Sequence, residues 1–226
     1  ALSGASSLML SLENPSSGLY GESGSAAGAS AYDNNALPDM VLRYNGKSGD
    51  FSYSLSGLLR EVAYKQNFSN SQAQVIAGDD SVYGYGLSFA GVWRLGADDI
   101  RLQLNAGNAL GRYLGIQTYR DGVIEDNGDI ELIDSVGGYI AYRHFWAPKW
   151  RSSLVLSASS ADNPATVEDT TAASYQSAHV NLVYAPIAAL DFGVEYIHAN
   201  KTIERPVNGD DSGDVDRLQF SAKYTF

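Results

Sequence analysis

The sequence predicts an all-β protein folded as an antiparallel up-and-down transmembrane β-barrel, and three observations support this expectation. Apolar and polar residues alternate with period 2 in segment after segment of the 226-residue chain. The connections between these segments are alternately short and long. No stretch approaches the roughly 18 consecutive apolar residues of a membrane helix. A helical membrane protein is therefore excluded, whereas alternating strands give only a weak hydropathy signal and fit the sequence.

The last segment shows the alternation most clearly, because Leu218, Phe220, Tyr224 and Phe226 share one parity and polar residues such as Arg217 fill the other. The same alternation can be followed from this last segment back through the preceding ones, and it gives ten strands. An even number of strands allows a closed barrel. The ten expected strands cover residues 7–13, 39–45, 51–60, 83–94, 100–110, 132–145, 150–159, 175–184, 190–201 and 215–226.

The lengths of the connections favour a membrane barrel over a soluble sandwich, because an outer-membrane barrel keeps its short turns at one rim and its long loops at the other. A soluble barrel with its apolar parity facing a ligand cavity is the weaker alternative. The Gly/Ser/Ala-rich residues 16–30 predict a flexible loop, which can also fold into the pore. The short connections are 46–50, 96–99, 147–149 and 185–189, and the long ones are 14–38, 61–82, 111–131, 160–174 and 202–214.

Aromatic residues of the apolar parity gather near the strand ends beside the short turns. Amphipathic rings prefer the headgroup depth of a membrane, so this placement is typical of an interfacial girdle. The girdle residues are Tyr44, Phe51, Trp93, Tyr142, Trp150, Tyr184, Phe192, Tyr224 and Phe226.

The opposite parity is basic although the chain carries a net charge of -11. The acidic total argues against a nucleic-acid binder, and most Asp and Glu residues fall in the long loops. On the strands, the carboxylates of the inward parity are mainly Glu13, Asp191 and Glu195. The cations expected to line the lumen are Arg43, Arg60, Arg94, Arg101, Arg143, Arg151, Arg217 and Lys223.

An arginine-lined lumen lowers the barrier for anions. Of the eight cations, Arg60, Arg101 and Arg217 are the expected contacts for a permeating carboxylate. For the arginines beside the short turns a second reading stays open, in which they line the wet mouth or pair with Asp191 and Glu195.

Catalytic and metal chemistry find little support. The absence of cysteine removes thiolate nucleophiles and zinc–thiolate sites. His179 is expected to face inward near Ser177 and Asn181, as a polar pore residue rather than a catalytic base. Residues 125–131 (EDNGDIE) lack the ligand spacing of a calcium loop. We therefore expect no metal, no cofactor and no enzymatic activity.

Two stretches carry a resemblance to a known family. Residues 190–204 (LDFGVEYIHANKTIE) and 213–226 (GDVDRLQFSAKYTF) resemble the last two strands of the DcaP-like outer-membrane porins of Gram-negative bacteria. Residues 46–64 (GKSGDFSYSLSGLLREVAY) resemble an internal hairpin of the same family. The resemblance implies a 16-stranded, trimeric, anion-preferring porin for dicarboxylate-like solutes. The final Tyr224 and Phe226 resemble the signal that the barrel-assembly machinery recognises.

These expectations give an outer-membrane channel for passive diffusion of small anions, with lipid and lipopolysaccharide around it and no nucleic acid as partner. The chain is expected to form a single barrel domain over residues 1–226, or the C-terminal portion of a larger barrel. The alternative function is a small closed barrel that acts as an adhesin or enzyme through its long loops.

Overall fold

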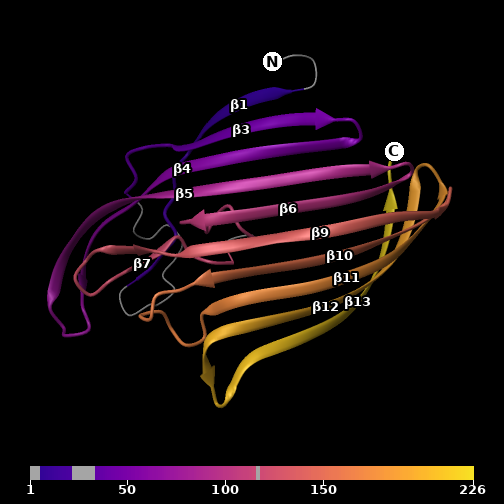
Figure 1. Ribbon diagram of the computed structural model, residues 1–226. Helices are drawn as coiled ribbons and strands as arrows, with labels where there is room; N and C mark the ends of the chain where they lie inside the picture. Colours follow the sequence, from indigo (N-terminus) through magenta and orange to yellow (C-terminus); the bar gives the residue numbers. More distant parts are fainter. Residues whose placement is uncertain (1–5, 22–33, 116–117) are drawn as a thin grey trace.

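The computed structural model describes residues 6–21, 34–115 and 118–226, and they form one strongly curved antiparallel sheet with a small second sheet (Figure 1). None of the described residues forms a helix able to cross a membrane. In spatial order the ten strands of the large sheet are β1 (Ser7–Glu13), β3 (Asp39–Ser48), β4 (Phe51–Ser69), β5 (Val75–Leu95), β6 (Asp98–Asn108), β9 (Asp134–Ala147), β10 (Trp150–Asp162), β11 (Ala172–Ile187), β12 (Leu190–Val207) and β13 (Asp210–Tyr224).

All ten predicted strands are confirmed, but several extend beyond their predicted ends. The predicted long loop 61–82 is wrong for most of its length, because β4 and β5 remain paired from Phe51↔Trp93 to Ser69↔Val75. The predicted loop 202–214 is likewise mostly strand, with β12 and β13 joined across residues 208–209. Alternation continues beyond the predicted ends: Val62 and Tyr64 share one face of β4 and are fully buried beneath an inward connection.

The pairing register divides the sheet into two faces. Cross-strand partners point to the same side, so a chain of partners can be followed from strand to strand. One such chain runs through Leu8, Tyr44, Leu55, Phe89 and Leu104, all on the outer, convex face. Most large apolar side chains of the convex face are exposed, for example Leu10 by 65% and Leu59 by 63%. This is expected of a surface that contacts lipid rather than water.

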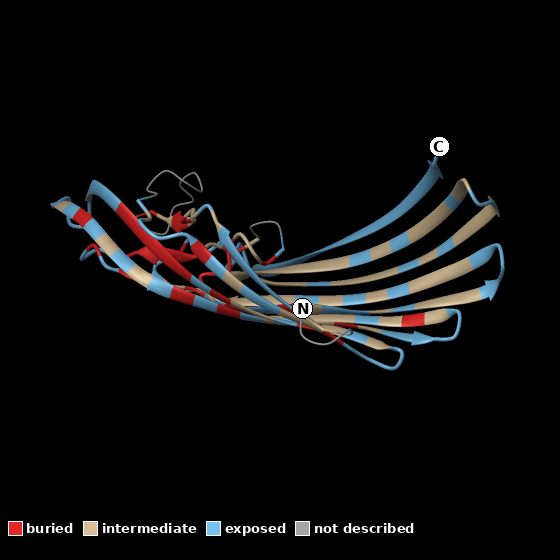
Figure 2. Cartoon of the chain, turned by 90° about the horizontal axis from the view of Figure 1, so that it is seen from above, coloured by how far each residue is buried: buried red, intermediate tan, exposed pale blue. Residues whose placement is uncertain are grey.

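A second, three-stranded sheet lies on the concave side, within two long connections. It consists of β2 (Leu19–Tyr20), β7 (Gly122–Ile124) and β8 (Ile130–Leu132) in the order β2-β7-β8. Figure 2 shows the buried residues gathered where this layer lies against one end of the large sheet. The core there includes Leu19, Val62, Tyr64 and Ile124. Ser16–Tyr20 thus fold inward, while most of the Gly/Ser/Ala-rich segment, residues 22–30, lies outside the described residues.

The two outer strands of the large sheet are unpaired on one side. β1 pairs with β3 and β13 pairs with β12, and among the described residues no pairing joins β1 to β13. Every residue of β13 is exposed. The concave side therefore opens as a trough in Figure 2 rather than as a closed tube.

Gly107 provides a stability test for the seam between β5 and β6. It has a φ of +155°, and a Cβ atom there would collide with the backbone carbonyl of Tyr85. We expect Gly107→Ala to lower the free energy of unfolding by about 1–3 kcal/mol, from strained backbone and overpacking. Urea titration in detergent micelles, followed by tryptophan fluorescence, measures this change.

Gly213→Ala is the matched control, because a Cβ atom at Gly213 meets no atom within 4 Å. Equal stability of the two variants would contradict the role assigned to Gly107.

Candidate functional site: the polar concave face

The pairing register places all eight cations named in the sequence analysis on one face, the concave face that carries the inward connections. For example, Val92 pairs with Arg101, and Arg94 pairs with Asp99, which in turn pairs with Arg143. Lys47, opposite Ser52, lies on the same face. The cations within or near the short-turn ends of the strands are Arg43, Lys47, Arg94, Arg101, Arg143, Arg151 and Lys223.

Some of these cations are paired with carboxylates. Arg101 donates through Nε to Asp99 Oδ1 at 2.8 Å, and Arg143 donates to the other oxygen of the same carboxylate. Arg151 donates to Asp191 Oδ2 at 2.8 Å, the pairing that the sequence analysis left open. Asp99 is 2% exposed and was not among the predicted inward carboxylates, because it sits where a turn was expected. Two arginines that share one carboxylate leave a net positive charge.

Other cations have no carboxylate within 4.0 Å among the described residues: Arg43, Lys47, Arg94, Arg217 and Lys223. The Arg43 Nε donates instead to the neutral Asn45 Oδ1 at 2.8 Å. Arg217 lies on the edge strand β13, opposite Ile197, and is exposed. These side chains present positive charge on the concave face without a carboxylate in direct contact.

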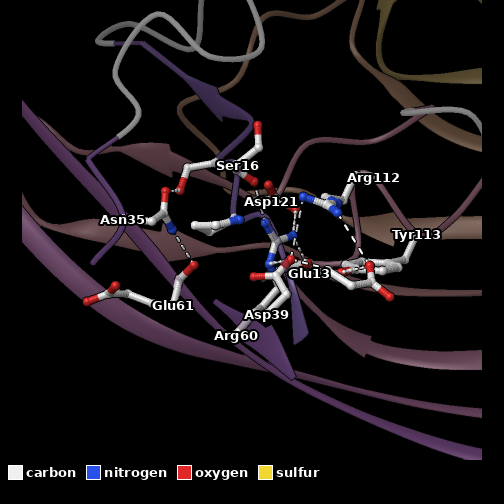
Figure 3. Close-up of polar contacts among 12 residues, drawn as sticks. Glu13, Ser16, Asn35, Asp39, Arg60, Glu61, Arg112, Tyr113 and Asp121 are labelled. Carbon is white, nitrogen blue, oxygen red and sulfur yellow. Dashed lines mark hydrogen bonds and ion pairs between the residues drawn. The ribbon is translucent and has the colours of Figure 1, made fainter. Parts of the chain in front are cut away.

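Arg60 has a different setting, because its side chain is buried and holds the inward connections against the wall (Figure 3). Its Nη1 donates to Asp121 Oδ1 and to the Ala109 carbonyl, each at 2.7 Å, and its Nη2 donates to the Ser16 carbonyl. Asp121 in turn accepts from the backbone N–H groups of Gly18 and Gly111 at 2.7 and 2.8 Å. One ion pair thus ties both connections to β4.

The polar cluster around Arg60 extends to the ends of β1 and β3. Asp39 Oδ2 lies 3.5 Å from Arg60 Nε, and both side chains are fully buried. The Tyr113 hydroxyl is 2.9 Å from Asp39 Oδ2 and 3.0 Å from Glu13 Oε2. Burial and the Asp39 carboxylate raise the pKa of Tyr113, so the phenol keeps the proton that it donates. Arg112 adds a second cation, 3.4 Å from Glu13.

The expectation that Arg60 contacts a permeating carboxylate does not fit this setting. Its guanidinium is enclosed by Asp39, Asp121 and two backbone carbonyls and is fully buried, so a solute in the lumen does not reach it. Sequence parity correctly indicates the face of Arg60, but it gives no information on which loop folds back over it.

His179 lies on the concave face between a serine and a glutamate. Ser177 Oγ is 3.0 Å from His179 Nε2, and Glu195 Oε1 is 3.7 Å from His179 Nδ1. An acyl-transfer site also needs donors for the oxyanion, but β10, β11 and β12 pair on both sides here, so their N–H groups serve the ladder. We interpret His179 as a polar wall residue.

No cluster of three or more metal-ligating side chains occurs among the described residues.

The convex face carries the expected aromatic residues beside the short turns. Trp150 and Tyr184 are directly opposite each other, and their rings stack with centroids 4.5 Å apart. Tyr224 and Phe226 at the chain end are exposed, with ring centroids 5.8 Å apart. Their role as an assembly signal stays a prediction.

Comparison with solved structures shows that this chain has the fold of outer-membrane β-barrel proteins. The outer membrane channel DcaP of Acinetobacter baumannii superposes with a TM-score of 0.79 at 20% sequence identity, over 100% of this chain and 60% of the DcaP chain. The chain thus spans about 60% of that channel's length. No protein-family model and no curated protein matches the sequence.

OmpT, an outer membrane protein of Vibrio cholerae, is also similar. One structure gives a TM-score of 0.50 at 13% identity, over 85% of this chain and 58% of OmpT. A trimer form of OmpT gives a TM-score of 0.52 at 13% identity, over 83% of this chain and 56% of that chain. At these identities the likeness concerns the fold.

The Arg60 ion pairs can be tested by proteolysis. Removing one partner of a buried ion pair costs about 3–5 kcal/mol, so Arg60→Ala should raise the population in which the inward connection 109–133 is released by more than about a hundredfold. That connection contains Arg112 and Arg120, which are trypsin sites. The initial rate of tryptic cleavage at these two residues in micelles measures the release.

Arg94→Ala is the control, because Arg94 is exposed and has no carboxylate partner among the described residues. Cleavage of Arg60→Ala at the wild-type rate would show that the connection is held by its apolar core alone.

Proposed function

We propose that the protein is an outer-membrane channel of a Gram-negative bacterium that lets small anionic solutes, dicarboxylates among them, diffuse passively. The fold shared with DcaP supports this proposal. So does the division of the sheet into an apolar convex face and a polar concave face, which a wall between lipid and water requires. The function is transport without chemistry on the solute.

The observation on which the proposal rests is the charge of the concave face. Near the short turns this face carries seven cations, while the carboxylates there are Asp99, Asp191 and Glu195, counted among the described residues. Like-signed charges in a water-filled passage with low-dielectric walls focus the field and raise the local concentration of counter-ions. Such a passage favours anions over cations.

Further parts of the proposal concern assembly. A sealed pore needs a partner for the free edges of β1 and β13, either from further strands or from each other. We propose a homotrimer in lipopolysaccharide-containing membrane, which is delivered by the barrel-assembly machinery. The fold shared with the trimer form of OmpT supports the oligomer, and the exposed aromatic Tyr224 and Phe226 support the delivery route.

Reversal potentials in planar bilayers across a KCl gradient test the channel. We expect the wild-type protein to prefer chloride over potassium. At about 8 Å in water one charge contributes about 0.5 kcal/mol, so each neutralised arginine should lower the preference about twofold. The triple variant Arg43→Gln, Arg94→Gln, Arg101→Gln should therefore lose it several-fold.

Lys65→Gln is the matched control, because Lys65 lies on the other face of β4 and pairs with Asp79. Cation preference or an absence of current from the refolded wild-type protein would overturn the proposed function. An unchanged preference in the triple variant would exclude the concave arginines as its origin.

A further inference from the structure

The concave face is organised in rows that cross several strands, and two neighbouring rows differ sharply in chemistry. The first, the arginine row, consists of the partnered residues Arg101, Ala141, Val155, His179, Ile197 and Arg217. The second, the hydroxyl row, consists of the partnered residues Gln103, Tyr139, Ser157, Ser177 and Ala199. The rows are two residues apart along every strand, which is about 7 Å.

The hydroxyl row forms one wall of a groove with a volume of about 440 Å³. The opposite wall is the inward connection at Tyr113, Leu114, Gly115 and Thr118. Asn105, Ser159 and Tyr175, which belong to the next row of the concave face, extend the groove. No described residue lining it is charged, although cations dominate the concave face on the side of the short turns. The groove therefore offers hydrogen bonds without a net field of its own.

The groups in the groove both donate and accept hydrogen bonds. The Ser157 and Ser177 hydroxyls lie 2.7 Å apart, and Gln103 Nε2 donates to Asn105 Oδ1 at 3.2 Å. The Tyr119 hydroxyl lies 3.0 Å from Ser159 Oγ. Hydroxyls and amides carry spare donors and acceptors beyond such contacts. A bound solute that has hydroxyl groups can use them, whereas an alkyl chain would strip their water without replacing it.

We propose that this groove and the arginine row together form a subsite for sugar acids, small anions that carry several hydroxyl groups. The carboxylate is held by Arg101, whose side chain is 46% exposed although its Nε donates to Asp99. The hydroxyl-bearing carbons then extend along β6 to Gln103 and its cross-strand partner Tyr139, one row further. This inference rests on the proposed channel function and names its solute class, so that hydroxylated acids are preferred over plain dicarboxylates.

The test compares two six-carbon dicarboxylates of equal charge, glucarate with four hydroxyl groups and adipate with none. Each is titrated against the chloride current through the wild-type channel in planar bilayers, and the concentration that blocks half of the current is measured. We expect glucarate to block at a concentration about tenfold lower than adipate. The groove is open to water, so the discrimination is far smaller than the 10⁴-fold of a buried site.

Variants assign the effect to the groove. Gln103→Ala with Tyr139→Phe should bring the glucarate block to within about twofold of the adipate block and leave adipate unchanged. Ser153→Ala is the control, because Ser153 is on the same strand and face as Ser157 but outside the groove. If the double variant does not assemble, the comparison is made with Gln103→Asn alone, in which the shorter side chain should weaken the glucarate block and leave the adipate block unchanged.

Equal block by the two acids, or stronger block by adipate, would overturn the sugar-acid subsite. A loss of discrimination in Ser153→Ala as large as in the double variant would also overturn it. Equal block by neutral glucitol and by glucarate would remove the carboxylate contact from the proposal. The chloride current without added solute tests the channel separately, so failure of the proposed function is recognised before any of these outcomes.

Discussion

The whole arrangement depends on an unbroken antiparallel ladder. In an apolar environment every backbone N–H and C=O group must find a partner within the protein, and paired strands provide this. A slip of one residue in any pair would move the arginines to the convex face and the leucines to the concave face. Because the strands of the large sheet keep their register except for irregularities near strand ends, a residue on β6 and a residue on β12 can be assigned to the same row.

A second constraint is the buried charge of Arg60. Burying a guanidinium is costly unless it is fully hydrogen-bonded and paired, so this residue requires Asp121 and the carbonyls of Ser16 and Ala109 around it. That requirement places two connections from distant parts of the chain on the same patch of wall. The resulting layer gives the groove its second side, since Tyr113 and Leu114 belong to the same connection as Asp121.

Sequence patterns predicted the strands well and the loops poorly, for a physical reason. Alternation is local, so the ten strands and the faces of Leu55, Arg101 and His179 follow from the sequence. The extension of the β4–β5 hairpin past Arg60 was missed because its polar residues are typical of a solvent-exposed loop. The partner of Arg60 lies 61 residues away, and no periodicity connects the two. Asp99 was missed at the end of a strand, where parity is hardest to assign.

Two kinds of interaction on the concave face, long-range charge and short-range hydrogen bonds, distinguish solutes in different ways. Unpaired cations such as Arg43 and Arg94 act through a field that reaches about 8 Å at physiological ionic strength and distinguishes solutes only by charge. Hydrogen-bonding groups such as Ser157 and Ser177 act only at contact and distinguish solutes by the groups they carry. In the channel that we propose, a solute passes both rows, so that charge attracts it and hydroxyl content sorts it. A channel built in this way needs no closed binding pocket to show a preference.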